Sequence, residues 1–368
     1  MTTLHAINRW VPLGVPVIAA VVLVLAWGTK PGIGVAIVLA IVLIAAILAA
    51  VHHAEVIAHR VGEPFGSLIL AVSVTIIEVG LIVSLSAGGD EHAATLARDT
   101  VFSAFMITTT GIVGLAILIG AFKFGTVRFN SEGSGAALAT LSTLAVLCLV
   151  LPDFTEASGP RFSPMQLTFA AIASLLLYVL FVITQTISHR TFFLPVTESG
   201  SAPAADEEAE EHGDPPSLAA TLTSLVLLLV ALVAVVGLAK VESPSIEGGV
   251  VALGLPESVV GVIIALVILL PEGISAVRAA QRNRIQTSLN LGLGSAMASI
   301  GLTIPAVAVA SIWMPQQLVL GLGETQIVLL LLSIVVSILT VVPGRATKLQ
   351  GGVHLVIFAA FLFLSVSP

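Results

Sequence analysis

The sequence is built around eleven apolar runs of 17 to 28 residues, and these runs limit the fold more than any other feature. A helix rises about 1.5 Å per residue, so about 20 apolar residues cross a hydrocarbon core of about 30 Å. With 57% hydrophobic and 10% charged residues, the chain is too apolar for a soluble globular protein. We therefore predict an all-α polytopic membrane protein with transmembrane helices at 11–27, 31–58, 66–86, 99–122, 135–151, 166–187, 218–239, 257–279, 288–313, 325–342 and 349–366.

The loops between these runs differ in positive charge. If the N-terminus is cytoplasmic, the loops on its side carry ten Lys and Arg residues and the opposite loops carry four. Loops rich in Lys and Arg stay in the cytoplasm. We therefore predict a cytoplasmic N-terminus and an external C-terminus.

A polar linker at residues 191–217 explains the net charge of −7. Its segment ESGSAPAADEEAEEHGD, residues 198–214, holds seven of the 21 acidic residues and no Lys or Arg. This composition is typical of a solvated segment, which we predict to be cytoplasmic. It could be a spacer or a cation-sensing tail. The single cysteine, Cys148, excludes a disulfide framework.

The chain shows a weak internal repeat across this linker. Glu55 and Gly62 precede EPFGSLILAVSVTIIE, and Glu247 and Gly254, at the same spacing, precede LPESVVGVIIALVILLPE. Five spans follow the linker, an odd number, so the second half would enter the membrane inverted. Inverted repeats are common in transporters. We predict an extra helix in 1–30 and five-helix repeats in 31–190 and 218–368.

Two glutamates end the repeated stretches inside apolar sequence. Glu78 lies 12 positions beyond Gly66, about 18 Å along a helix, and so near the middle of the bilayer. Glu272 follows Pro271, which cannot donate to the carbonyl of Val267 and so predicts a helix break. A lone carboxylate in hydrocarbon must be paired, protonated or bound to a cation. The pair can hold one divalent cation or two protons, so we predict a cation and proton site.

Calcium takes six to eight oxygen ligands, more than two carboxylates supply. Nearby spans offer hydroxyl groups at Thr75, Thr108 and Ser295, with Ser299 one turn further on. Membrane hydroxyls also bond back to their own helix, so each of these residues has a structural alternative.

A second acidic group lies near the ends of the spans: Glu55, Glu247 and Glu257. His52 and His59 stand three residues before and four residues after Glu55, on one helical face. This group could pass protons or sense pH, or it could be an interfacial polar patch.

Other functional classes fit less well. A cation channel also needs membrane acids, but channel filters come from symmetry or pore loops. No HExxH or GxSxG motif appears, so we expect no enzyme activity. We expect no binding to nucleic acid. We expect the partners to be the lipid bilayer and the transported cations and protons, with a homo-oligomer as an alternative to a monomer.

The stretches GEPFGSLILAVSVTIIEV and LLPEGISAVRAAQRNRIQTSLNLGLGSAMASIGLTIP together resemble the cation/proton exchangers of the calcium/cation antiporter superfamily, in particular the bacterial calcium (sodium or potassium)/proton antiporters. The resemblance covers about residues 31 to 366. It implies an inverted five-plus-five bundle with an extra first helix, a bacterial inner membrane location and no cofactor. It also implies outward calcium transport driven by inward protons, with sodium or potassium as alternative cargo.

By this resemblance the central acidic pair of the family matches Glu78 and Glu272. Its outer acidic residues match Glu55 and Glu247, and the serine after glycine in the second half matches Ser295.

The chain departs from the family pattern at three places. Thr75 and Leu269 stand where relatives carry asparagine, and this leaves the cation selectivity open. Ala104 stands at the place of the first-half serine, and Thr108 is expected to compensate.

Overall fold

The computed structural model describes residues 2–29, 31–62, 65–86, 94–157, 159–196, 216–256, 258–313 and 317–367. Every predicted span is helical within these ranges. The first half contains α1 (Thr2–Ala26), α2 (Ile33–Val61), α3 (Phe65–Ser86), α4 (Leu96–Met106), the π-helix η2 (Ile107–Ile112), α5 (Val113–Phe124), α6 (Ser131–Ala145), the π-helix η3 (Val146–Val150), the 3₁₀ turn η4 (Leu151–Phe154), α7 (Pro164–Ile183), the π-helix η5 (Thr184–Ser188) and the 3₁₀ turn η6 (Arg190–Phe193).

The second half contains α9 (Leu218–Ala252), α10 (Ser258–Ile268), α11 (Leu270–Gln281), α12 (Ile285–Ala310), α13 (Glu324–Val341) and α14 (Lys348–Val366). Two short strands, β1 (Val127–Arg128) and β2 (Arg345–Ala346), pair antiparallel. Most of the predicted acidic linker, residues 197–215, lies outside the described residues.

Helix length and composition in the structure indicate fewer membrane spans than the eleven that the sequence predicted. Among the described residues nine helices are long and apolar enough to cross a membrane, and the bent pair α10–α11 makes up to ten. The apolar part of α1, Val11–Ala26, is shorter. Helix α9 is longer than predicted, because it continues through Pro244 to Ala252. Its buried residues Val241 and Val250 belong to one hydrophobic core on either side of this proline.

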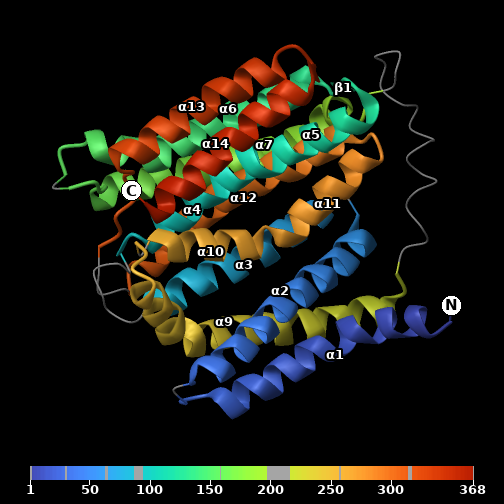
Figure 1. Ribbon diagram of the computed structural model, residues 1–368, viewed down its shortest axis with the longest axis vertical. Helices are drawn as coiled ribbons and strands as arrows, with labels where there is room; N and C mark the ends of the chain where they lie inside the picture. The colour runs from blue at the N-terminus through green and yellow to red at the C-terminus, as the bar shows by residue number, and fades with distance from the viewer. Residues whose placement is uncertain are drawn as a thin grey trace.

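The helices run roughly along one common direction, and the chain ends lie at opposite ends of the bundle (Figure 1). At one end β1 follows α5 and β2 follows α13, and Lys123 at the end of α5 donates to the carbonyl of Gln281 at the end of α11. At the other end Arg98 donates to the carbonyl of Gly321, and Arg161 to the side chain of Gln317. Basic loops predicted to share one side of the membrane therefore lie together.

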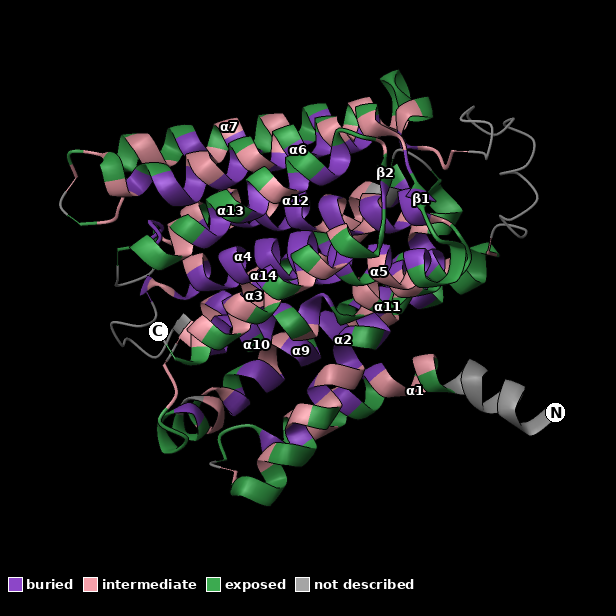
Figure 2. Cartoon of the chain, turned by 45° about the horizontal axis from the view of Figure 1, so that its top comes forward, coloured by how far each residue is buried: buried purple, intermediate pink, exposed green. Residues whose placement is uncertain are grey.

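Three hydrophobic cores of described residues hold the bundle together. One joins α1, α2 and α9 to the facing sides of α3 and α10, a second joins α4, α6 and α7 with α12 to α14, and a smaller third joins α5 to α11, α12 and the paired strands. Figure 1 shows α1, α2 and α9 as a layer along one side of the molecule. Buried residues follow the inner faces of the helices (Figure 2). Large apolar side chains remain exposed on the outside, such as Ile33 at 84% and Val24 at 76%, which suits contact with lipid.

Helix α1 is attached to the bundle through a buried histidine. Pro16 has no N–H, so the carbonyl of Pro12 loses its helical donor. The Nε2 atom of His53, in α2, lies 3.0 Å from that carbonyl oxygen. Its Nδ1 atom lies 3.2 Å from the hydroxyl of Ser224 in α9. His53 therefore connects α1, α2 and α9.

Candidate functional site

The carboxyl group of Glu78 is buried in the middle of the bundle. Glu78 lies in α3 and is 3% exposed. It accepts hydrogen bonds from two hydroxyls of α12, from Ser299 at 2.6 Å and from Thr303 at 2.9 Å. Ser295, Ser299 and Thr303 are spaced four residues apart, so all three face α3 from one side of α12.

A small cavity adjoins Glu78. Its volume is about 10 Å³, and its lining includes Thr75, Ser295 and Ser299. Thr75 uses its own hydroxyl to donate to the carbonyl of Ala71 at 2.8 Å, so its oxygen retains lone pairs for another partner. The cavity has room for about one water molecule. Three residues that we predicted as cation ligands, Glu78, Thr75 and Ser295, therefore lie together.

The helix break lies on the other side of this cavity. Helix α10 ends at Ile268 and α11 begins at Leu270, with a bend of 52° between them. Leu269 at the break lines the Glu78 cavity. Pro271 stands in the first turn of α11, where a missing N–H costs nothing.

Glu272 lies in the same first turn of α11 but is not among the residues that line the Glu78 cavity. Its Oε2 atom is buried and has no hydrogen-bond partner among the described residues. Glu78, by contrast, is fixed by its two hydrogen bonds from α12.

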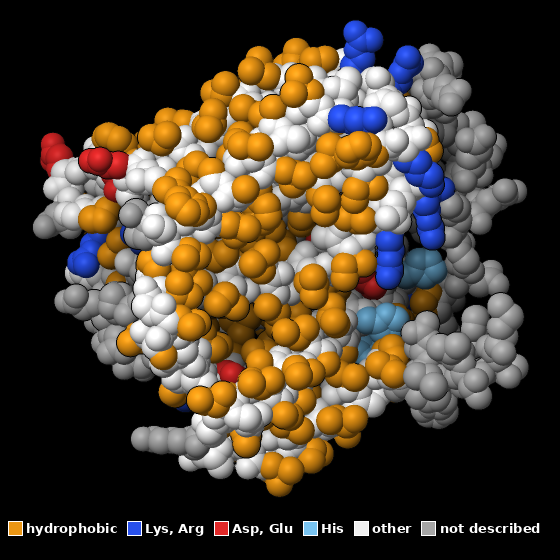
Figure 3. All heavy atoms as spheres, in the orientation of Figure 1, with side chains coloured by type: hydrophobic (Ala, Val, Ile, Leu, Met, Phe, Trp, Pro, Cys, Tyr) orange, Lys and Arg blue, Asp and Glu red, His pale blue; other side chains and the backbone are white. Residues whose placement is uncertain are grey.

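The outer acidic group is only partly described. Glu55, His52 and His59 have exposed side chains on α2. Figure 3 shows histidine and acidic side chains beside Lys and Arg side chains at the right of the molecule, where α2 and α11 end in Figure 1. Glu247 lies in α9 with a side chain outside the described part, and Glu257 lies outside the described residues.

Thr108 is placed differently from the other expected ligands. It is fully buried in η2, but its hydroxyl donates to the carbonyls of Ala104 and Phe105 in its own helix. Ala104, and not Thr108, lines the Glu78 cavity. Sequence reasoning missed Thr303, although its four-residue spacing from Ser299 was a usable signal. No group of three His, Cys, Asp or Glu side chains gathers among the described residues.

Comparison with known proteins identifies the family to which the chain belongs. The model of the sodium/calcium exchanger protein family matches residues 31–187 and 223–367, which cover most of the chain and both helices that carry the central glutamates. The chain belongs to this exchanger family. It is therefore a membrane transporter that exchanges cations.

Two curated bacterial relatives are similar to the chain in sequence, and one solved structure is similar to it in fold. A putative ionic transporter (y4hA) of Sinorhizobium fredii is 46% identical over 88% of this chain and 86% of the relative. The sodium-potassium/proton antiporter ChaA of Escherichia coli is 38% identical over 94% of this chain and 93% of the relative. The crystal structure of the H⁺/Ca²⁺ exchanger CAX has a TM-score of 0.70 at 16% identity, covering 98% of this chain and 89% of that chain. This last likeness shows the fold.

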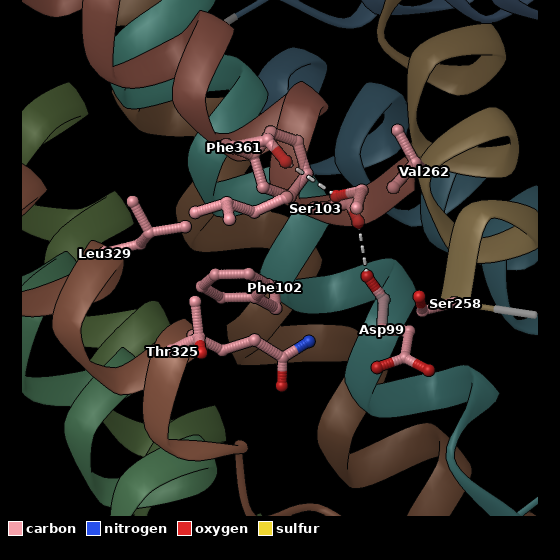
Figure 4. Close-up of a pocket in the computed structure, with 11 residues that line it drawn as sticks. Asp99, Phe102, Ser103, Ser258, Val262, Thr325, Leu329 and Phe361 are labelled. Atoms are coloured by element: carbon pink, nitrogen blue, oxygen red, sulfur yellow. Dashed lines mark hydrogen bonds between the residues drawn. The ribbon is translucent and has the colours of Figure 1, made fainter. Parts of the chain in front are cut away.

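A larger cavity of this exchanger lies toward the end of the bundle that carries Arg98. Its volume is about 130 Å³, and its lining includes Asp99, Ser103 and Ser258. Figure 4 shows the Asp99 carboxyl beside Ser258, with Ser103 donating to the Asp99 carbonyl. Asp99 is 5% exposed and accepts from Arg98 at 2.8 Å. Ser103 stands next to Ala104 of the Glu78 cavity, so the two cavities follow the same stretch of α4.

Proposed function

We propose that this exchanger moves a cytoplasmic cation outward in return for external protons, and that Glu78 and Glu272 carry both. The observation that carries the proposal is the fully buried Glu78 carboxyl, which faces hydroxyl groups and a cavity inside an otherwise apolar bundle. A carboxyl group in such a place is stable when it is protonated or bound to a cation. Alternation between these two states is what a proton-coupled exchanger requires.

An inverted repeat is the architecture that we propose for the exchange. Its support is that α2 and α9 begin at opposite ends of the bundle (Figure 1). Both helices are followed by a glycine in the left-handed region, Gly62 with φ 74° and Gly254 with φ 65°. Glu78 lies in α3, the helix after Gly62, and Glu272 lies in α11, the second helix after Gly254. The two glutamates thus hold corresponding places in the proposed halves.

Alternating access would follow from movement of α2 and α9 against the remaining helices. Its support is the hydrophobic core that joins these two helices to α1 and to the inward faces of α3, which carries Glu78, and α10, which leads to Glu272. A shift of α2 and α9 would therefore change the surroundings of both glutamates. Glu78 also accepts hydrogen bonds from α12, which lies outside this core.

Calcium is the cargo that we propose first, because two carboxylates neutralise one divalent cation and two protons equally well. Sodium or potassium is the second candidate. The E. coli relative is described as a sodium-potassium/proton antiporter, and Leu269 offers no oxygen from its side chain where the wider family carries asparagine.

The proposed setting is the inner membrane of a bacterium, with the end of the bundle that carries Lys123 and the paired strands in the cytoplasm. The support is the gathering of Lys and Arg loops at that end. Calcium, or sodium or potassium, would then enter the protein from this side.

The test is proton release from one preparation of proteoliposomes that contain the purified protein. Calcium, sodium and potassium are added in turn to vesicles with an imposed pH gradient and an interior pH dye. We expect calcium to dissipate the gradient at the lowest concentration. If sodium or potassium dissipates the gradient and calcium does not, the cargo is sodium or potassium. If none of the three cations dissipates it, proton-coupled exchange is overturned.

A further inference from the structure

The span formed by α4, η2 and α5 contains a π-helical turn in its middle. The N–H of Val113 donates to the carbonyl of Thr108, five residues back. In an α-helix the same N–H would donate to Thr109, four residues back. The Thr109 carbonyl has therefore lost its α-helical donor inside a bundle where an unpaired carbonyl is costly.

His354 of α14 supplies the missing donor. Its Nδ1 atom lies 2.9 Å from the Thr109 carbonyl oxygen. A carbonyl only accepts, so Nδ1 carries a hydrogen, and the Nε2 atom lies 3.1 Å from the Thr340 hydroxyl. His354 is fully buried, and α14 approaches so closely that a Cβ on Gly114 would lie 2.7 Å from the His354 Cβ.

A neighbouring face of the same π-helical turn meets the start of α11, next to the second glutamate. The Ile112 side chain lies 3.7 Å from the place where Gly273, the residue after Glu272, would carry a Cβ. The Thr108 carbonyl is similarly 3.6 Å from the Cβ position of Gly292 in α12. The turn η2 therefore contacts His354 through one face and the start of α11 through the neighbouring face.

A π-helical turn holds one residue more than an α-helical turn. Each residue of an α-helix turns the chain by about 100°. If the π-helical turn became α-helical, the extra residue would leave the turn, and the part of the span before it would rotate against the part after it. Ile112 and Thr108 could not then both keep their present contacts. The hydrogen bond from His354 to Thr109 favours the π-helical form over this alternative.

We propose that His354 is a positioning residue of the exchanger: its bond to the Thr109 carbonyl stabilises the π-helical turn Ile107–Ile112 and so fixes the surface against which Glu272 binds its cation. The inference rests on the proposed exchange at Glu78 and Glu272. A histidine that merely joined α13 to α14 would affect stability without a specific effect on cation affinity.

Three variants and one control separate these roles. His354→Asn keeps an amide donor near the place of Nδ1, and His354→Leu removes both hydrogen bonds. Thr340→Val removes only the partner of Nε2. Phe361→Leu is the control, because Phe361 is a buried residue of the same helix that packs on Phe102 of α4.

The first measurement is the KM for the transported cation in proteoliposomes. We expect His354→Leu to raise KM by about tenfold, the order expected when a buried carbonyl loses its donor, with a smaller effect on the maximal rate. His354→Asn should stay within about threefold of the wild type, and Thr340→Val should lie between the two. An unchanged KM in His354→Leu, or equal KM values in the Asn and Leu variants, would overturn the inference.

The second measurement needs no transport. Hydrogen exchange of residues 107–114 in nanodiscs should be faster in His354→Leu than in both the wild type and Phe361→Leu. Equal protection in all three would show that His354 does not stabilise the turn. If exchange depends on His354 while the wild type moves no cation, the proposed function fails and the structural part of the inference stands. If wild-type transport is normal but protection is independent of His354, the inference fails alone.

Discussion

At the scale of single residues, Glu78 is defined by the hydroxyl groups that face it. Ser299 and Thr303 both donate to its carboxyl oxygens, one oxygen each. Hydrogen bonds to a charged group contribute about 1.5–3 kcal/mol, more than bonds between neutral groups. These two hydroxyls therefore stabilise the negative charge that a cation would bind.

Removal of the Ser299 hydroxyl tests this role. We expect Ser299→Ala to raise the KM for the transported cation by about tenfold, the lower end of what loss of a charge-assisted bond predicts. Cation-driven proton flux in proteoliposomes gives the value. Ser174→Ala is the matched control, because Ser174 is a fully buried serine of α7 whose hydroxyl bonds within its own helix. Equal KM values for both variants would contradict the role of Ser299.

Sequence reasoning at this scale identified the residue types but not all of their contacts. Glu78, Thr75 and Ser295 lie together, as polar residues in apolar spans suggested. Thr108 instead bonds back to its own helix, a choice between competing acceptors that spacing alone does not decide. His354 could not be assigned from sequence either, because its partners Thr109 and Thr340 lie on two other helices.

At the scale of helices, close approach depends on small residues and on breaks. The break after Ile268 was predictable, because Pro271 cannot donate a hydrogen bond. The π-helical turn η2 was not, because Ile, Thr and Gly also fit an α-helix. Gly261 in α10 shows how tightly α10 meets α4, since a Cβ there would lie 2.9 Å from backbone atoms of Asp99 and Thr100.

A methyl group at Gly261 should therefore force α10 away from α4. We expect Gly261→Ala to lower the free energy of unfolding by about 1–3 kcal/mol, the usual cost of an overpacked core. The apparent Tm in detergent, measured by loss of monodisperse protein on heating, should fall. Gly135→Ala in α6 provides the comparison, because nothing lies within 4 Å of its Cβ position. A Gly261 variant as stable as this control would show that the two helices separate without cost.

At the scale of the whole molecule, the eleven apolar runs predicted where the helices lie. Apolar length alone does not decide how many of these helices cross the membrane. Helix α1 has a short apolar part, and its attachment through His53 to α2 and α9 is a contact between distant residues. The sorting of basic loops to one end was predictable, because charge in loops reflects the side of the membrane.

Two exposed glutamates test the proposed orientation. Glu132 begins α6 at the end with the paired strands, and Glu156 follows α6 at the opposite end. After replacement of Cys148, Glu156→Cys in intact cells should react with a membrane-impermeant maleimide, and Glu132→Cys should react only after lysis. The reverse pattern would invert the orientation, and reaction of both in intact cells would contradict a single crossing by α6.

In the exchange that we propose, Glu78 and Glu272 carry cation and proton in turn. The most direct measurement is cation-driven proton flux in proteoliposomes for Glu78→Gln and Glu272→Gln, with Glu324→Gln, an exposed glutamate in the first turn of α13, as the control. Glutamine keeps the size of the side chain but cannot exchange a proton for a cation. We predict that each central variant loses the coupled flux while Glu324→Gln keeps it. Full flux in either central variant would contradict the proposed site.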